Sequence, residues 1–186
     1  MRIALLARDC LLLLCCVSAT LVYGQDRQAK MSLAGGKFEL TAPASWVRKQ
    51  PKSSIIEYEF AIPHAADDTS DGRLTVMPAG GSVDANIDRW YSQFAQPDGT
   101  ATRDRAKVKK ISAAGEDVHM VDISGTFKDQ RGPAAPAVEQ PKYRMLAAII
   151  TTKSEGNYLI KFYGPERTVA QNEPAFRKMI EGLERK

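Results

Sequence analysis

The stretch SIIEYEFAI, residues 54–62, alternates apolar and polar side chains with a period of two. Such alternation is typical of a strand in a sheet that has one buried face and one wetter face. We therefore expect a β-sheet at the centre of the fold, with this stretch as one of its strands. The side chains expected on the buried face are Ile56, Tyr58, Phe60 and Ile62.

Other stretches have the same character and are separated by turn residues, notably at 114–115 and 154–156. Tight turns join strands that pair antiparallel, because parallel pairing needs long crossover connections. The sequence thus predicts an antiparallel sheet. In addition to 54–62, the expected strands are residues 37–40, 73–77, 107–113, 116–127, 143–152 and 157–163.

Two helices are expected, each with one apolar stripe at the helical period. The first follows the glycine pair at 80–81, with Ser82 as its expected N-cap. The second closes the chain, with Pro174 in its first turn. Because each stripe must cover a sheet face, the fold class is α+β, an antiparallel sheet flanked by two helices in an α/β/α sandwich. The stripes are Val83, Ile87, Trp90, Tyr91 and Phe94, and then Phe176, Met179, Ile180 and Leu183.

The first 24 residues have the layout of a secretory signal peptide. Arg2 and Arg8 precede an apolar run over residues 10–22, and Gly24 precedes the expected cleavage point. The run has about 13 residues, whereas a spanning helix needs roughly 20. We expect an exported protein, periplasmic or extracellular, whose mature chain has no transmembrane segment. Cleavage after Ala19 and retention of the leader as an anchor are the alternatives.

After cleavage, residues 25–36 are expected to form a flexible tail and residues 37–186 a single α+β domain. Cys10, Cys15 and Cys16 all fall in the leader, so the mature chain would contain no cysteine. Disulfides, thiol nucleophiles and thiolate metal sites are thereby excluded. The mature chain keeps 24 basic and 21 acidic side chains, and a net charge of +3 does not require a nucleic acid partner.

Two segments resemble the PsbP-like fold superfamily. Near the start, a strand at residues 38–40 leads into a Pro-x-x-Trp turn at residues 43–46. Near the end, a strand at residues 158–162 precedes a terminal helix that places Phe176 and Ile180 inward. The resemblance covers nearly the whole of the expected mature chain.

This resemblance implies an antiparallel sheet between helices and a role without catalysis. Members of the superfamily are accessory proteins, among them extrinsic photosystem subunits and a nuclear transport factor that binds a small GTPase. Export would exclude the transport role, and no motif here carries the photosystem role. The glycine pair at 80–81, with Asn86, Asp88, Arg89 and Trp90, also resembles exported bacterial proteins of unassigned function.

The sequence predicts no catalytic residues. A Ser–His–Asp triad would have to use His64 or His119. His119 shares a strand face with Asp117, but Ser124 falls on the opposite face. No serine has the glycine on both sides that a nucleophile elbow requires. A hydrolase with an unrecognised active site remains the least favoured alternative.

No metal or cofactor is predicted either. His64, Asp67, Asp68 and Asp71 lie within eight residues, but their spacing matches neither an EF-hand loop nor a zinc motif. A solvated turn explains the same residues. Residues 80–82 precede a helix, where anions can bind, but the lysine of a phosphate-binding loop is absent. A helix cap is the better interpretation of these residues.

Two surfaces are candidates for contact with a partner. A cationic strip would form if residues 103–109 were extended, with Ala106 and Val108 facing inward. It could hold an anionic polymer, a lipid headgroup or an acidic partner, although lysines that guard an edge strand give the same pattern. The other surface is a long loop at residues 128–142, which contains three prolines. The strip consists of Arg103, Arg105, Lys107 and Lys109.

The favoured function is a non-catalytic binding or assembly module of the cell envelope. Its partner would be an unknown envelope protein or an anionic surface, with no nucleic acid and no cofactor. The alternative is a carrier for a small apolar or anionic ligand in a cleft between sheet and helix.

Overall fold

A computed structural model describes residues 29–130 and 136–186. The expected leader, its cleavage site and residues 25–28 lie outside the described residues. In chain order the elements are β1 (Ala29–Leu33), the 3₁₀ helix η1 (Ala34–Gly36), β2 (Phe38–Ala42), β3 (Val47–Lys49), β4 (Tyr58–Ile62), β5 (Gly72–Ala79), α1 (Val83–Ser92), β6 (Phe94–Ala95), α2 (Thr102–Arg105), β7 (Lys107–Ala113), β8 (Glu116–Asp129), β9 (Val138–Thr151), β10 (Asn157–Pro165), α3 (Glu166–Glu181) and β11 (Glu184–Arg185).

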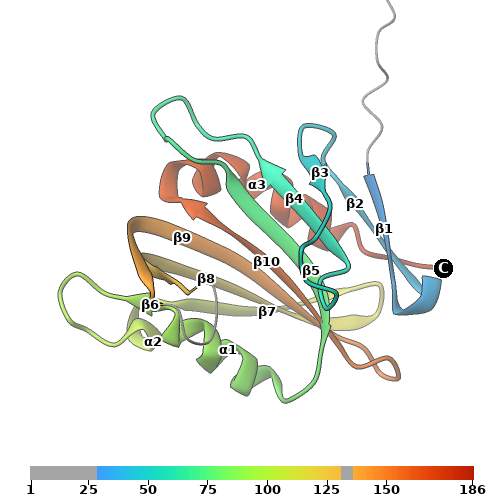
Figure 1. Ribbon diagram of the computed structural model, residues 1–186. Helices are drawn as coiled ribbons and strands as arrows, with labels where there is room; N and C mark the ends of the chain where they lie inside the picture. Colours follow the sequence, from blue (N-terminus) through green and yellow to red (C-terminus); the bar gives the residue numbers. More distant parts are fainter. Residues whose placement is uncertain (1–28, 131–135) are drawn as a thin grey trace, which may run out of the picture.

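The strands form two sheets, and every strand pair is antiparallel. The large sheet has the order β3-β4-β5-β10-β9-β8-β6, and β7 also pairs with β8. The small sheet has the order β1-β2-β11 and lies beside the large one (Figure 1). No helix in the described part of the chain is long and apolar enough to cross a membrane. The predicted α+β fold class is confirmed.

Helices α1 and α3 cover opposite faces of the large sheet (Figure 1). One core cluster joins Ile87 and Trp90 of α1 to the sheet, and a second joins Phe176 and Ile180 of α3 to it. Alternating residues of β9 divide between the two clusters, as period-two geometry requires. Met145, Ala147 and Ile149 face the α1 side, and Leu146, Ala148 and Ile150 face the α3 side.

Helix α1 begins where the sequence predicted. The hydroxyl of Ser82 accepts a hydrogen bond from the backbone N–H of Ala85 at 3.1 Å, which is the expected N-cap. Ile87 and Trp90 are buried, as their place in the stripe requires. Phe94, the last residue of the stripe, is also buried but lies on β6 beyond the end of the helix.

Helix α3 begins earlier than expected, so the prediction that Pro174 lies in its first turn is wrong. Pro174 is inside the helix, which starts at Glu166. Its N-terminus is capped from a distant loop, because the carboxylate of Asp68 accepts hydrogen bonds from the N–H and the hydroxyl of Thr168, at 2.9 and 2.6 Å. A cap that comes from 100 residues away leaves no local signal in the sequence.

The expected strand at residues 54–62 forms only from Tyr58 onward. The segment before it turns, and Ile55 is 65% exposed. The backbone N–H of Glu57 donates to the carbonyl of Val76 at 2.9 Å, so pairing with β5 starts there. Strand β3 was not predicted, because all three of its residues are exposed and carry no apolar alternation.

The prediction of a flexible tail at residues 25–36 is wrong from residue 29 onward. Strand β1 pairs along its whole length with β2, and Met31 and Leu33 are buried. The hydroxyl of Tyr58 also donates to the carbonyl of Ser32 and accepts from its N–H, both at 2.9 Å. Two apolar residues at strand spacing were the available signal for this strand.

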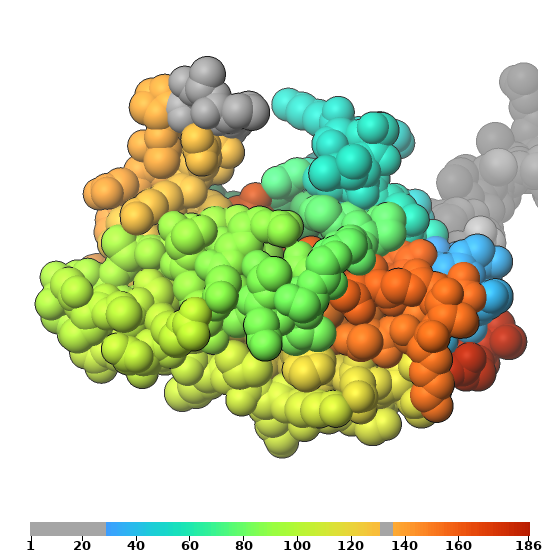
Figure 2. Space-filling model, turned by 90° about the horizontal axis from the view of Figure 1, so that it is seen from below, coloured from blue at the N-terminus to red at the C-terminus, as the bar shows by residue number. Residues whose placement is uncertain are grey.

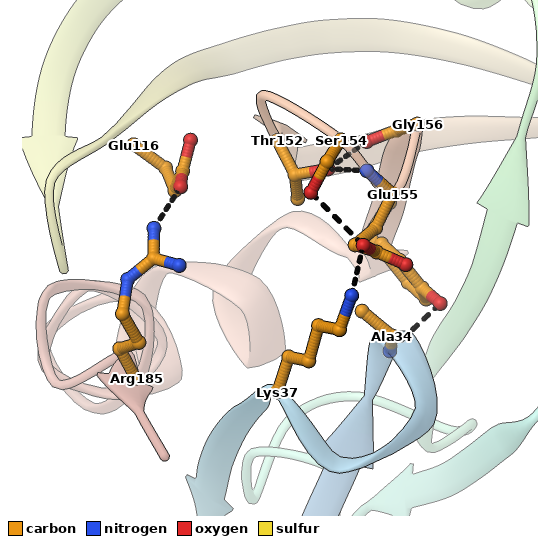
Figure 3. A network of polar contacts seen from close by, with 9 residues as sticks. Ala34, Lys37, Glu116, Thr152, Ser154, Glu155, Gly156 and Arg185 are labelled. Carbon is orange, nitrogen blue, oxygen red and sulfur yellow. Dashed lines mark hydrogen bonds and ion pairs between the residues drawn. The ribbon is translucent and has the colours of Figure 1, made fainter.

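The small sheet shares a hydrophobic core cluster with the large one, and polar contacts near the hairpin tips also join the two (Figure 3). Each contact joins a residue of the small sheet or its 3₁₀ turn to a residue of β8, β10 or the turn before β10. They are the ion pairs Lys37–Glu155 and Arg185–Glu116, and the hydrogen bond from the N–H of Ala34 to the hydroxyl of Tyr158 at 2.8 Å.

The expected loop at residues 128–142 is largely a hairpin of β8 and β9, so this prediction is wrong for its described ends. Strand β8 continues to Asp129 and β9 starts at Val138. Pro141 is tolerated in β9 because the register shifts between Gly125 and Phe127, and a bulge accepts a residue that cannot donate a hydrogen bond. Residues 131–135 lie outside the described residues.

Candidate functional site

The structure does not form the predicted cationic strip. Arg103 and Arg105 lie on the short helix α2, whereas Lys107 and Lys109 lie on β7. The two arginines are also paired, because Arg103 contacts Asp88 at 2.7 Å and Arg105 contacts Asp98. The change from helix to strand at Ala106 means that the four side chains do not follow one extended face.

On β7 the polar residues fit the other interpretation of the strip, in which lysines protect an edge strand. Lys107 and Lys109 are exposed, and so is Val108, at 47%, although it was expected to face inward. Within the described residues β7 pairs only with β8, so its other side is a free edge. Lysines on a free edge oppose pairing with another chain.

The loop of residues 63–71 does not gather its acidic side chains. Asp71 accepts from Nδ1 of His64 at 2.8 Å, and this hydrogen bond holds the pKa of Asp71 below its ordinary value. Asp68 caps α3, and Asp67 pairs with Arg167. In residues 29–130 and 136–186, no three His, Cys, Asp or Glu side chains are grouped to hold a metal ion.

Asp117, which was considered for a triad with His119, is engaged in another contact. The carboxylate of Asp117 pairs with Nζ of Lys110 at 2.7 Å, and this contact lowers the pKa of Asp117. His119 is half-buried on β8, opposite Ile149 of β9.

A cleft of about 830 Å³ opens on the α1 side of the large sheet. Its floor comes from β5 and β10, and its walls come from the end of α1, the β8–β9 hairpin and the segment before β4. Figure 2 shows the molecule hollowed between the hairpin, in gold and orange, and the segment leading into β4, in cyan. The charged residues that line the cleft are Lys52, Arg73, Arg89, Lys128, Asp129 and Lys161.

Lys161 is the central cation of this cleft. It is half-buried on β10, and its Nζ donates to Oε1 of Gln93 at 3.0 Å. The same Nζ lies 4.6 Å from the ring centroid of Tyr163 and 5.6 Å from that of Phe127. Burial, with a smaller contribution from the charge of Arg73, lowers the pKa of Lys161 to about 8. No carboxylate of the described residues forms an ion pair with it at contact distance, although the charge of Asp129 opposes the lowering of its pKa.

Arg73, beside it on the floor, is fully engaged. Its Nε and Nη2 donate to the two carboxylate oxygens of Glu59 at 3.0 and 2.9 Å, and Nη1 donates to the hydroxyl of Tyr163 at 2.8 Å. The bonds to Glu59 raise the pKa of Arg73 above its ordinary value. Burial raises the pKa of Tyr163, and the bond from Arg73 opposes this rise. Arg73 therefore orders the floor, while its charge is matched by Glu59.

The cations on the walls are less constrained. Lys52 and Arg89 are exposed and Lys128 is half-buried. None of the three forms an ion pair with another described residue. Asp129 contributes the one negative charge among the charged lining residues of the described chain. The cleft is thus positively charged. The aromatic ring of Phe127, which lines it, stacks against Tyr143, with 6.0 Å between the ring centroids.

Replacing Lys161 with methionine should stabilise the free protein by about 1–2 kcal/mol at pH 7. The folded pKa of about 8 lies below the ordinary 10.5, so the buried charge costs stability in full below pH 8. That cost falls as pH rises from 8 to 10.5, because over this range Lys161 is deprotonated in the native state but still protonated in the unfolded state. Urea unfolding at pH 7 and pH 10 measures the effect, and the gain should shrink at the higher pH.

The exposed Lys110→Met change is the control, and because it removes only a surface ion pair with Asp117 it should cost less than about 1 kcal/mol. A Lys161→Met protein that is less stable than the parent at pH 7 would show that Lys161 is part of the stabilising core.

The sequence offered a ligand cleft between sheet and helix as an alternative, but it assigned no residues to that cleft. Its lining residues are spread from position 52 to position 163, and no local motif joins them. One signal was present, since Lys161 is a lysine inside the apolar strand YLIKFY. A charge within a buried strand is rarely tolerated without a partner or a function.

Comparisons with known proteins identify no family for this chain. No family model matches the chain, and no curated protein matches it. Similar solved structures include cyanobacterial PsbP from Synechocystis, with 12% identity, a TM-score of 0.49 and coverage of 91% of this chain and 99% of that chain. Another is the Ran-binding protein Mog1p of Saccharomyces cerevisiae, with 9% identity and a TM-score of 0.48. That match covers 85% of this chain and 95% of the Mog1p chain.

A protein from Bacteroides thetaiotaomicron is similar over 86% of this chain and 48% of its own, with 11% identity and a TM-score of 0.43. All three TM-scores lie below 0.5, and no function follows from these similarities.

Proposed function

We propose that this protein is an exported, non-catalytic binding module that holds a small anionic ligand in the cleft between α1 and the large sheet. The observation that carries the proposal is Lys161, a half-buried ammonium that forms no ion pair with the described residues. Export rests on the signal-like first 24 residues.

The position of Lys161 is energetically unfavourable in the free protein. Burial disfavours its charged form, which is the physical reason for its lowered pKa. An unpaired charge of this kind is common at binding sites, because a ligand of opposite charge supplies the missing partner. Since Arg73 is already matched by Glu59, an anion would gain most from Lys161 and the wall cations.

The shape of the cleft supports a small ligand. Its volume of about 830 Å³ falls within the roughly 300–1,000 Å³ typical of small-molecule sites. Neither His64 nor His119 lines it, and its charged groups are mainly cations that suit holding an anion. These features suit a site that holds an anion.

The sequence favours a binding or assembly module of the cell envelope, whose partner is an envelope protein or an anionic surface. That interpretation relied on the strip at residues 103–109 and on a long loop at residues 128–142. The strip is divided between α2 and β7, and the described ends of the loop are strands. The cleft therefore offers the better-supported binding site.

Titration with the dye 1-anilinonaphthalene-8-sulfonate, which joins a sulfonate to apolar rings, tests the proposal. We expect saturable binding to the parent protein, and at least tenfold weaker binding to Lys161→Met. The Lys110→Met protein, which loses the same charge elsewhere, should bind like the parent. Equal binding by all three proteins would overturn the proposal.

A further inference from the structure

The cations of the cleft lie on two levels. Lys161 stands on the floor formed by β10, whereas Lys52, Arg89 and Lys128 belong to the walls. We propose that the ligand is a multivalent oxyanion of the phosphate type carried on an apolar body, an inference that rests on the proposed anion site. The two levels would contact the same charged group, or two groups of one molecule.

The balance of charge favours a multivalent ligand. Four lining cations, Lys52, Arg89, Lys128 and Lys161, form no ion pair with the described residues, and among the described lining residues Asp129 is the one carboxylate. A monovalent anion would leave most of this positive charge unmatched. A phosphate monoester carries nearly two negative charges at neutral pH and presents three acceptor oxygens.

The donors available at the floor favour a tetrahedral anion. Arg73 has the planar fork that matches a carboxylate, but Glu59 and Tyr163 already occupy it. Lys161 offers a compact ammonium with three donors, of which one goes to Gln93. Such a point charge has no preference for a planar acceptor, and several cations can share the oxygens of one phosphate.

The size and lining of the cleft indicate that the charged group is attached to something larger. A single phosphate would fill only a small part of about 830 Å³. Phe127, Ala137 and Tyr163 add apolar surface among the cations. An organic body could contact this surface while its oxyanion meets Lys161, which is the usual division of roles in a small-molecule site.

Displacement of the sulfonate dye by matched probes tests the inference at pH 7. Phenyl phosphate and benzenesulfonate share a ring and differ in charge, and inorganic phosphate lacks the ring. We expect phenyl phosphate to displace the dye at about tenfold lower concentration than either of the others. In the Arg89→Gln, Lys128→Gln double variant, the concentrations of benzenesulfonate and phenyl phosphate that displace the dye should differ by threefold or less.

The outcomes separate the two proposals. If phenyl phosphate and benzenesulfonate displace the dye equally well, the anion site stands and the multivalent ligand is overturned. If inorganic phosphate matches phenyl phosphate, the apolar body is overturned. If the dye does not bind to the cleft in the first place, the proposed function itself fails.

The phosphate could belong to a soluble molecule or to a lipid headgroup, and sedimentation with vesicles distinguishes the two. Protein that pellets with phosphatidic acid vesicles but not with phosphatidylcholine vesicles, and is released by phenyl phosphate, supports the inference with a lipid as the source. Protein that remains in solution while still binding phenyl phosphate supports it with a soluble source. Pelleting that phenyl phosphate does not reverse would overturn the cleft as the phosphate site.

Discussion

Replacing Trp90 with alanine is expected to lower the free energy of unfolding by about 3–5 kcal/mol. Trp90 is 4% exposed and belongs to the core cluster that joins α1 to the large sheet. Truncating a buried indole removes apolar contact and leaves a cavity that the rigid sheet below cannot fill. Urea unfolding monitored by circular dichroism measures the loss.

Ser92→Ala is the matched control, because Ser92 is exposed on the same helix. Its effect should stay within about 0.5 kcal/mol. A Trp90→Ala protein as stable as the parent would mean that α1 does not depend on its apolar stripe for attachment to the sheet. Because α1 forms a wall of the cleft, the same variant should also weaken dye binding.

Replacing Arg144 with methionine is expected to cost about 2–4 kcal/mol at pH 7. Its Nε and Nη2 both contact Asp122 at 2.8 Å, and Nη2 also contacts Glu173 of α3 at 2.7 Å. The three side chains are between 14% and 26% exposed. Removing the arginine leaves two carboxylates that are largely shielded from water and have lost a shared partner.

The loss should become smaller in acid. Burial alone would raise the pKa of Glu173, but Arg177 and Arg144 together hold it below the ordinary 4.5. In the parent, this carboxylate therefore stabilises the fold above pH 4.5, and the contribution disappears as pH falls through the lowered pKa. Without Arg144 the charged form is less favoured, so the deficit of the variant should be smaller at pH 4 than at pH 7.

Urea unfolding of both proteins at pH 7 and pH 4 measures this difference. Arg177→Met is the control, since Arg177 is 39% exposed and contacts Glu173 from the same helix. Its cost should be below about 1 kcal/mol. An Arg144→Met protein whose deficit is the same at both pH values would show that the lost packing, and not the lost charge, is responsible.

Local patterns predicted most of the secondary structure. The turn at residues 114–115 forms where expected, with φ angles of 52° at Ala114 and 78° at Gly115. The stripe of α1 and the cap at Ser82 are also present. These features depend on residues only a few positions apart, which is why the sequence displays them directly.

The errors have a common physical origin. Strand β1 exists because β2 pairs with it, and the start of α3 is stabilised by Asp68 from a distant loop. Pro141 fits in β9 because a bulge in the β8–β9 pairing accommodates it. Each of these depends on a partner far away in the chain, and propensity at a single site gives no information about such a partner.

By itself the sequence determined the fold class, since period-two strands, two apolar helical stripes and tight turns leave few ways to bury the same side chains. Only the tertiary structure decided the site. Strand pairing places Lys161 next to the strand of Arg73, and the packing of α1 brings Arg89 and Gln93 to the same cleft. Charges from separate elements act together only once folding has made them neighbours, because their interaction depends on distance in space.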